Sequence, residues 1–213
     1  MLVLTLCYRI IGFVREMLVA SYLGTSAEAD AYSIAYSVPT VVVEMLALGA
    51  IGSASIAVFQ SVLQKDGKQR LNQLYSRVMA AILLALAALL LLCELGAPLL
   101  TKLMAPSFSG EKMALTVSMV RSMLPAILFV GVLGLQKAAL NLMGDFRSEG
   151  ISNVVFNCAM VAGVLFAARQ DRIDILIHSF IAAAFLQWLV QFRSIRRVGL
   201  RPSPDLHLRD EDL

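Results

Sequence analysis

A long, almost uninterrupted apolar run near the middle of the chain constrains its fold more than any other feature. Residues 78–100 read VMAAILLALAALLLLCELGAPLL, and Glu94 is their only charged side chain. An α-helix rises 1.5 Å per residue, so about 20 apolar residues cross the roughly 30 Å hydrocarbon core of a bilayer. The run therefore predicts a transmembrane helix.

The composition of the whole chain supports the same class of protein. Of the 213 residues, 59% are hydrophobic and 15% are charged, and the mean hydropathy is +0.77. Soluble domains carry about a quarter charged residues, which provide the polar surface that this chain lacks. We therefore expect an all-α membrane protein. The net charge of +3 is small and gives no indication of nucleic-acid binding.

Six transmembrane helices joined by short polar connections follow from the same criterion. The predicted helices are 1–23, 31–62, 78–100, 122–143, 151–168 and 173–192. The predicted connections are 24–29, 65–74, 105–112, 144–150 and 169–172. The second helix is too long for one perpendicular crossing, so we expect it to tilt and to kink near Pro39. Residues 1–198 would then form one transmembrane unit, and residues 199–213 a polar cytoplasmic segment that leads into a further part of the protein.

The Lys and Arg residues of the connections indicate the orientation, because cytoplasmic loops carry an excess of both. With the N-terminus inside, the cytoplasmic side takes Lys65, Lys68, Arg70, Arg77, Arg147, Arg193, Arg196, Arg197, Arg201 and Arg209. The outer side takes only Lys102, Lys112, Arg169 and Arg172. We therefore expect a multi-pass membrane protein with both termini in the cytoplasm.

Charged side chains within the apolar helices are the candidate site residues. Placing a charge at the bilayer centre costs at least about 2.5 kcal/mol, so such residues usually face a polar cavity or a partner. Arg15 lies near the middle of the first helix, which favours a cavity, whereas Arg9 fits either a cavity or a snorkelling side chain. Glu16 and Asp30 are the candidate counter-ions, although Arg15 and Glu16 are adjacent and we expect their side chains to diverge. Glu44 requires a partner from another helix or a proton.

Familiar catalytic and metal-binding patterns are absent from the sequence. It contains no Walker motif, no GxSxG and no HExxH. Cys7, Cys93 and Cys158 lie far apart in apolar stretches, without the spacing of a metal site or of a disulfide framework. We therefore expect no enzymatic activity, no catalytic residue, no metal ion and no cofactor.

Several short motifs resemble one family of membrane transporters. They are YRIIGFVRE at 8–16, DAYSIAYSVP at 30–39, LMAPSF at 103–108, ALNLMGDF at 139–146 and RPSPDLHLRD at 201–210. Together they are similar to the MviN/MurJ family of the multidrug/oligosaccharidyl-lipid/polysaccharide exporter superfamily. The resemblance implies about fourteen helices in two lobes around a central cavity. It also implies alternating-access transport of an undecaprenyl-pyrophosphate-linked saccharide, the lipid II-type peptidoglycan precursor, across the inner membrane.

The resemblance also assigns partners and site residues. It implies that Arg9, Arg15 and Asp30 contribute to the substrate cavity, where fixed cations suit a pyrophosphate head group. With Glu16 and Glu44, these residues form the candidate substrate-binding set. The implied partners are the lipid-linked saccharide, the membrane lipids, and a second half-transporter or a C-terminal lobe.

One departure from the family pattern keeps other functions open. Where the family has a pair of arginines, this chain has Val43 and Glu44. Loss of two cations and gain of an anion would alter a pyrophosphate site, so a flippase for another lipid-linked oligosaccharide, of the exopolysaccharide type, is one alternative. The others are a drug/cation antiporter-like protein and a membrane subunit that transports nothing.

Overall fold

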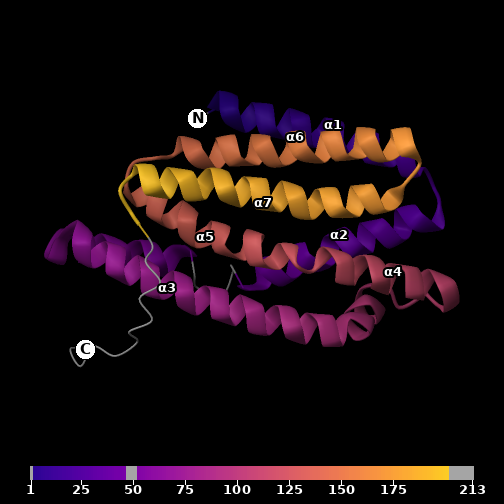
Figure 1. The fold of residues 1–213 in the computed structure, drawn as a ribbon, viewed down its shortest axis with the longest axis horizontal. Coiled ribbons are helices and arrows are strands. Elements are labelled where there is room, and N and C mark those ends of the chain that lie inside the picture. The colour runs from indigo at the N-terminus through magenta and orange to yellow at the C-terminus, as the bar shows by residue number, and fades with distance from the viewer. Residues whose placement is uncertain (1, 47–51, 202–213) are drawn as a thin grey trace.

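The computed structural model describes residues 2–46 and 52–201, which fold into seven helices without a strand (Figure 1). The helices are α1 (Leu2–Leu23), α2 (Ala27–Leu46), α3 (Gly52–Met104), α4 (Gly110–Met123), α5 (Ala126–Leu142), α6 (Arg147–Gln170) and α7 (Ile173–Arg197). They lie roughly side by side in one elongated bundle, and the chain turns back at its ends between α1 and α2, between α5 and α6, and between α6 and α7 (Figure 1). The predicted all-α fold is confirmed.

Three of the described helices are long and apolar enough to cross a membrane. They are α6, α7 and the part of α3 from Ser55 to Met104, and α4 and α5 qualify together as one broken span. Neither α1 nor α2 meets the same criterion. Each carries three charged side chains, Arg9, Arg15 and Glu16 in α1 and Glu28, Asp30 and Glu44 in α2. That α1 and α2 also cross the membrane stays a prediction.

The helix boundaries around α3 differ from the prediction. The expected helix over 31–62 is divided between α2 and α3, and the expected loop over 65–74 is helical. Gly67 alone breaks the helical path, with φ 78° and ψ −175°, a conformation that a residue without a Cβ adopts easily. The polar composition of residues 65–74 predicts a loop, because a helix that extends beyond the bilayer has the same polar composition as a loop.

The predicted helix over 122–143 is the second half of a bent pair. α4 and α5 meet at Leu124 and Pro125 with a bend of 47°. Proline has no N–H to donate to the preceding turn, and its ring disfavours the helical conformation of the residue before it. The bend therefore lies where the sequence places Pro125.

The bundle is held by close helix contacts at small residues. α6 packs along α7 and against α1, and α5 packs against α3 and α7. At Gly163 of α6 a Cβ atom would lie 2.2 Å from the Oγ of Ser179 in α7, and at Gly131 of α5 it would lie 2.6 Å from Leu86 in α3. Small residues at such crossings let helix backbones approach in membranes, where helices gain little from hydrophobic association.

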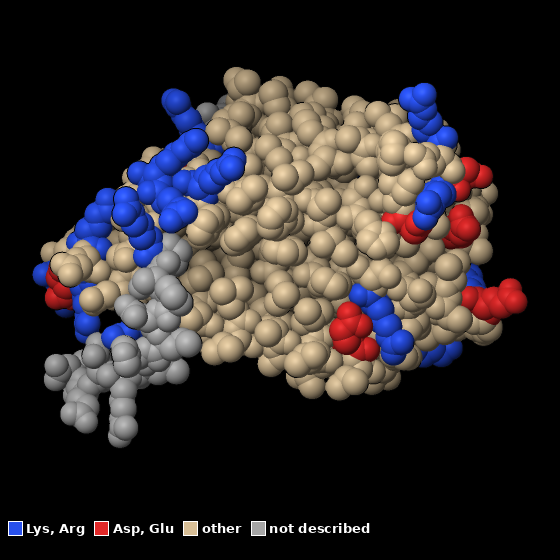
Figure 2. Space-filling model, viewed as in Figure 1, with Lys and Arg blue, Asp and Glu red and all other residues tan. Residues whose placement is uncertain are grey.

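Basic side chains gather at one end of the bundle. Figure 2 shows Lys and Arg clustered at the end where α7 finishes, while basic and acidic side chains mix at the other end. At the basic end the backbone after α7 is fastened to α3: the Asn72 amide accepts a hydrogen bond from the Arg201 N–H and donates one to the Arg201 carbonyl (3.0 Å). Leu200 is fully buried beside this pair. The segment that leaves α7 therefore has a fixed position on α3.

The short turn between α5 and α6 is capped by a carboxylate. Asp145 accepts hydrogen bonds from the backbone N–H groups of Arg147 and Ser148 (both 3.1 Å) and from the Ser148 hydroxyl (2.5 Å). Burial acts to raise the pKa of Asp145, but these hydrogen bonds outweigh it and the pKa is lowered. The side chain is therefore ionised at neutral pH and offsets the unpaired N–H groups at the start of α6.

Candidate functional site

The candidate site is an open pocket of about 260 Å³ between α1 and α2. Its lining includes Arg15 and Glu16 from α1 and Tyr32, Ser33 and Tyr36 from α2. These two helices contact each other over a small area, since α1 packs mainly on α6 and α2 mainly on α4. The pocket occupies the space between α1 and α2, which pack on different neighbours.

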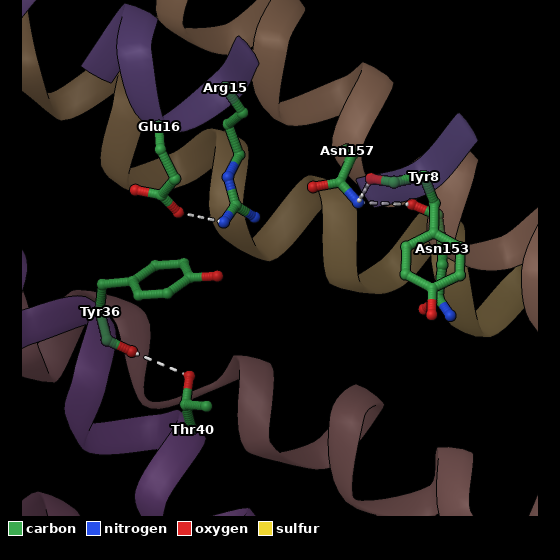
Figure 3. Close-up of polar contacts among 7 residues, drawn as sticks. All are labelled: Tyr8, Arg15, Glu16, Tyr36, Thr40, Asn153 and Asn157. Atoms are coloured by element: carbon green, nitrogen blue, oxygen red, sulfur yellow. Dashed lines mark hydrogen bonds and ion pairs between the residues drawn. The ribbon is translucent and has the colours of Figure 1, made fainter. Parts of the chain in front are cut away.

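Arg15 is the cation of the pocket, and most of it is shielded from solvent. Its side chain is 13% exposed, whereas that of the adjacent Glu16 is 62% exposed. The guanidinium donates a hydrogen bond to the Glu16 carboxylate (Figure 3). The expectation that these two side chains diverge is therefore wrong. Neighbouring residues point about 100° apart on a helix, but both side chains are long enough to bend toward each other.

Two aromatic rings lie close to the Arg15 guanidinium. Its central carbon lies 5.5 Å from the ring centroid of Tyr36 in α2 and 5.9 Å from that of Phe156 in α6. Figure 3 shows Arg15 extending from α1 toward the Tyr36 ring. Phe180 of α7 packs edge-on against both rings, at 5.1 and 6.1 Å between centroids. Cation–π attraction holds the guanidinium in a place where water is scarce.

Uncharged polar side chains connect the helices behind the pocket. Asn157 of α6 donates to the backbone carbonyls of Tyr8 (3.5 Å) in α1 and Asn153 (3.0 Å), as Figure 3 shows. The side-chain amide of Gln187 in α7 donates to the side-chain amide oxygen of Asn153 at 2.8 Å, and Gln191 donates to the Ser152 hydroxyl at 3.0 Å. Such interhelical hydrogen bonds fix the positions of the helices that support the site.

The other candidate residues lie outside the pocket lining. Arg9 and Glu44 are exposed, and neither forms an ion pair with a residue of the described ranges. Asp30 pairs with Lys112 of α4 at 2.5 Å, and the same Lys112 ammonium lies 4.2 Å from the Phe108 ring centroid. Asp30 therefore joins the first turn of α2 to α4 and is not the counter-ion of Arg15. Of the five predicted residues, the structure brings together only Arg15 and Glu16.

Sequence reasoning missed the aromatic and amide residues of the site. Tyr32 and Tyr36 are four residues apart and share a helix face, a signal that was available in the segment AYSIAY. The amides of α6 and α7 were also visible as polar residues within apolar spans. The role of Phe156 could not be predicted from the neighbouring sequence, because it depends on contact with Arg15, which lies 141 positions earlier in the chain.

The arrangement of the pocket is suited to binding an anion. Arg15 offers several N–H donors in one plane, which matches the geometry of a phosphate group. The Ser33, Ser37 and tyrosine side chains add polar groups to the pocket wall. Within residues 2–46 and 52–201, no group of three His, Cys, Asp or Glu side chains is placed to hold a metal ion.

Comparisons with known proteins agree on one family. The family model described as the lipid II flippase MurJ matches residues 19–213. The lipid II flippase MurJ of Burkholderia cenocepacia is 27% identical over 202 residues, which are 93% of this chain and 39% of that protein. A probable lipid II flippase MurJ of Rickettsia prowazekii is 27% identical over 213 residues, 99% of this chain and 42% of the relative.

A solved structure supports the same fold. It is a lipid II flippase MurJ in an inward closed conformation, with a TM-score of 0.78 and 23% sequence identity. The alignment covers 95% of this chain and 43% of that structure. The chain thus spans about two fifths of the length of the curated relatives it matches.

Proposed function

This chain belongs to the family of the lipid II flippase MurJ, and from that premise we propose that it forms one lobe of a flippase for an undecaprenyl-pyrophosphate-linked saccharide of the lipid II type. Residues 1–198 form the N-terminal lobe, and residues 199–213 lead toward a second lobe that completes the cavity. The protein lies in the bacterial inner membrane with both ends of the lobe in the cytoplasm. The lobes carry the lipid by alternating access, with no covalent chemistry.

The observation that supports this proposal is the shielded position of Arg15. Keeping a guanidinium that is only 13% exposed in an apolar helix costs free energy, so its presence there indicates a functional role. Glu16 is mostly exposed, so it neutralises the cation only partly and can move aside when an anion enters. A pyrophosphate head group is such an anion, and its interaction with Arg15 is strengthened by the low dielectric constant of the pocket. Arg9, Glu16, Asp30 and Glu44 complete the proposed substrate-contacting set.

Substitution of Arg15 in the flippase that contains this lobe tests the proposal. We expect Arg15→Ala to abolish complementation of a strain depleted of its own flippase, although the protein reaches the membrane in normal amount. Arg15→Lys should restore growth only partly, because an ammonium cannot make the planar two-point contact of a guanidinium with phosphate. Arg169→Ala, which removes an exposed arginine at the end of α6, is the matched control and should complement fully.

Two results would contradict the assignment. Normal growth with Arg15→Ala at wild-type protein level would show that the cation does not act on the substrate. Equal rescue by Arg15→Lys and the wild type would indicate a charge that only snorkels to the interface.

A second candidate is a flippase for a different lipid-linked oligosaccharide. Glu44, together with Val43, replaces a pair of cations that the family pattern places on the second helix, and Glu44 is exposed. The lipid-linked sugar that accumulates when the gene is removed distinguishes the two candidates. Accumulation of the peptidoglycan precursor supports the first, and accumulation of another lipid-linked glycan supports the second.

A further inference from the structure

An apolar groove of about 340 Å³ lies between α3, α5 and α7, apart from the pocket between α1 and α2. Its walls include Leu83 of α3, Phe129 of α5, and Trp188 and Phe192 of α7. The three rings form a continuous aromatic wall, with centroid distances of 6.0 Å between Phe129 and Trp188 and 5.1 Å between Trp188 and Phe192. The groove has the apolar lining of a binding site for a hydrocarbon chain.

One polar residue in this groove lacks a partner. Gln136 of α5 is fully buried, and neither atom of its amide has a hydrogen-bond partner among the described residues. Leaving a buried amide unpaired costs about 1–3 kcal/mol per group. Hydrocarbon alone would leave this cost in place, whereas the ester carbonyl of a phospholipid can accept a hydrogen bond from the amide nitrogen. Gln136 lies six residues before the end of α5, about 9 Å along the helix axis at the helical rise.

The groove lies close to the basic end of the bundle. The guanidinium carbon of Arg196 lies 5.6 Å from the ring centroid of Phe192, so this cation contacts a residue of the groove wall. Arg193 and Arg197 are exposed on the same last turns of α7. The ammonium of Lys68 in α3 lies against Gly199, which brings a further cation to this end. Figure 2 shows these positive charges gathered beside an uncharged surface.

We propose that this groove binds an anionic phospholipid, with one acyl chain along the aromatic wall, an ester carbonyl at Gln136 and the phosphate at Arg196 and its basic neighbours. Each basic residue near a membrane surface contributes about 1 kcal/mol to the attraction of anionic lipid. The acyl chain does not distinguish one phospholipid from another, so the preference for an anionic head group comes from the arginines. The groove and the substrate pocket are separate sites, because they have no lining residue in common.

The sequence supplies a built-in reporter, since Trp188 is the only tryptophan of the chain. The 213-residue chain is reconstituted in phosphatidylcholine vesicles that contain either brominated phosphatidylglycerol or brominated phosphatidylcholine. Bromine on an acyl chain in the groove quenches Trp188 fluorescence. We expect the anionic lipid to quench at a severalfold lower mole fraction than the zwitterionic lipid.

Matched variants assign the preference to the site. Arg196→Gln should weaken the relative association of the anionic lipid about fivefold, the equivalent of about 1 kcal/mol. Arg169→Gln, at the other end of the bundle, should change nothing. Gln136→Leu should weaken quenching by both lipids, because both carry esters. Far-UV circular dichroism of each variant confirms that it is folded.

Three results would overturn the proposal in folded protein. Equal quenching by both lipids would mean that the groove holds ordinary bilayer lipid without selection. Absence of quenching would mean that protein, and not lipid, fills the groove. An equal loss of preference in Arg196→Gln and Arg169→Gln would mean that overall charge, and not this site, attracts the lipid.

Discussion

Arg15 illustrates how a single cation is accommodated in an apolar helix. Glu16 supplies a hydrogen bond and a negative charge, and the rings of Tyr36 and Phe156 supply their electron-rich faces. Sequence alone predicted that Arg15 faces a polar space, because a charge in that position needs a cause. The spacing of Tyr32 and Tyr36 marks one face of α2, but the sequence could not show that the rings of Tyr36 and Phe156 meet at the guanidinium, because only the packing of α2 and α6 brings them there.

Tyr36 offers a test of this environment. Tyr36→Leu should lower the stability of the protein by about 0.5–2 kcal/mol, because the ring is lost as a partner of the cation. Tyr36→Phe should be close to the wild type, since it keeps the aromatic face. Thermal unfolding in detergent, followed by far-UV circular dichroism, measures both variants. If Phe and Leu destabilise equally, the hydroxyl matters and the ring–cation contact does not.

At the scale of helices, the sequence located apolar segments well and helix ends poorly. The predictions for 151–168 and 173–192 lie within α6 and α7, because an unbroken apolar run has few alternatives in a membrane protein. The predicted start of the helix over 78–100 differs from the start of α3, because the apolar composition stops at the bilayer surface whereas the helix continues beyond it. The polar segment that contains Gly67 looks the same whether it forms a loop or a helix that extends into water.

Because α6 packs closely on α7, we expect the methyl group that Gly163→Ala adds to lower the stability of the protein. Gly163→Ala would place a Cβ atom within 2.3 Å of the Ser179 side chain. The Ser179 hydroxyl also donates a hydrogen bond to the Ile175 carbonyl at 2.7 Å. We expect a loss of about 1–3 kcal/mol in stability, typical of overpacking. The measurement is again thermal unfolding in detergent.

Two further variants make the test of this contact specific. Gly134→Ala is the control, because nothing lies within 4 Å of the added carbon, and it should be neutral or slightly stabilising. Combining Gly163→Ala with Ser179→Gly should recover part of the loss. A double variant as unstable as the sum of the single ones would argue against a clash between these two side chains.

At the scale of the whole molecule, the alternation of helices places the loops at two ends with different charge. The end where α7 finishes is basic, and the other end is mixed (Figure 2). The count of Lys and Arg in the sequence predicted this separation, since it depends only on where the chain turns. The direction of the bundle in the membrane stays a prediction that rests on the same count.

Cysteine labelling tests the predicted orientation. Cys7 and Cys158 are exposed and Cys93 is buried, so all three are first replaced by serine or alanine. Single cysteines at Lys68 and Lys112 should then react with a membrane-impermeant reagent from opposite sides, Lys68 from the cytoplasm and Lys112 from outside. Reaction of both from one side would refute the predicted topology.

The pairing of Asn72 with the backbone of Arg201 has a mechanical consequence. Because one side chain holds both the N–H and the carbonyl of Arg201, the backbone from the end of α7 to Arg201 is coupled to α3 as well as to α7. A force applied at Arg201 would therefore be shared between α7 and the part of α3 that follows Gly67, with Leu200 buried between the two attachments.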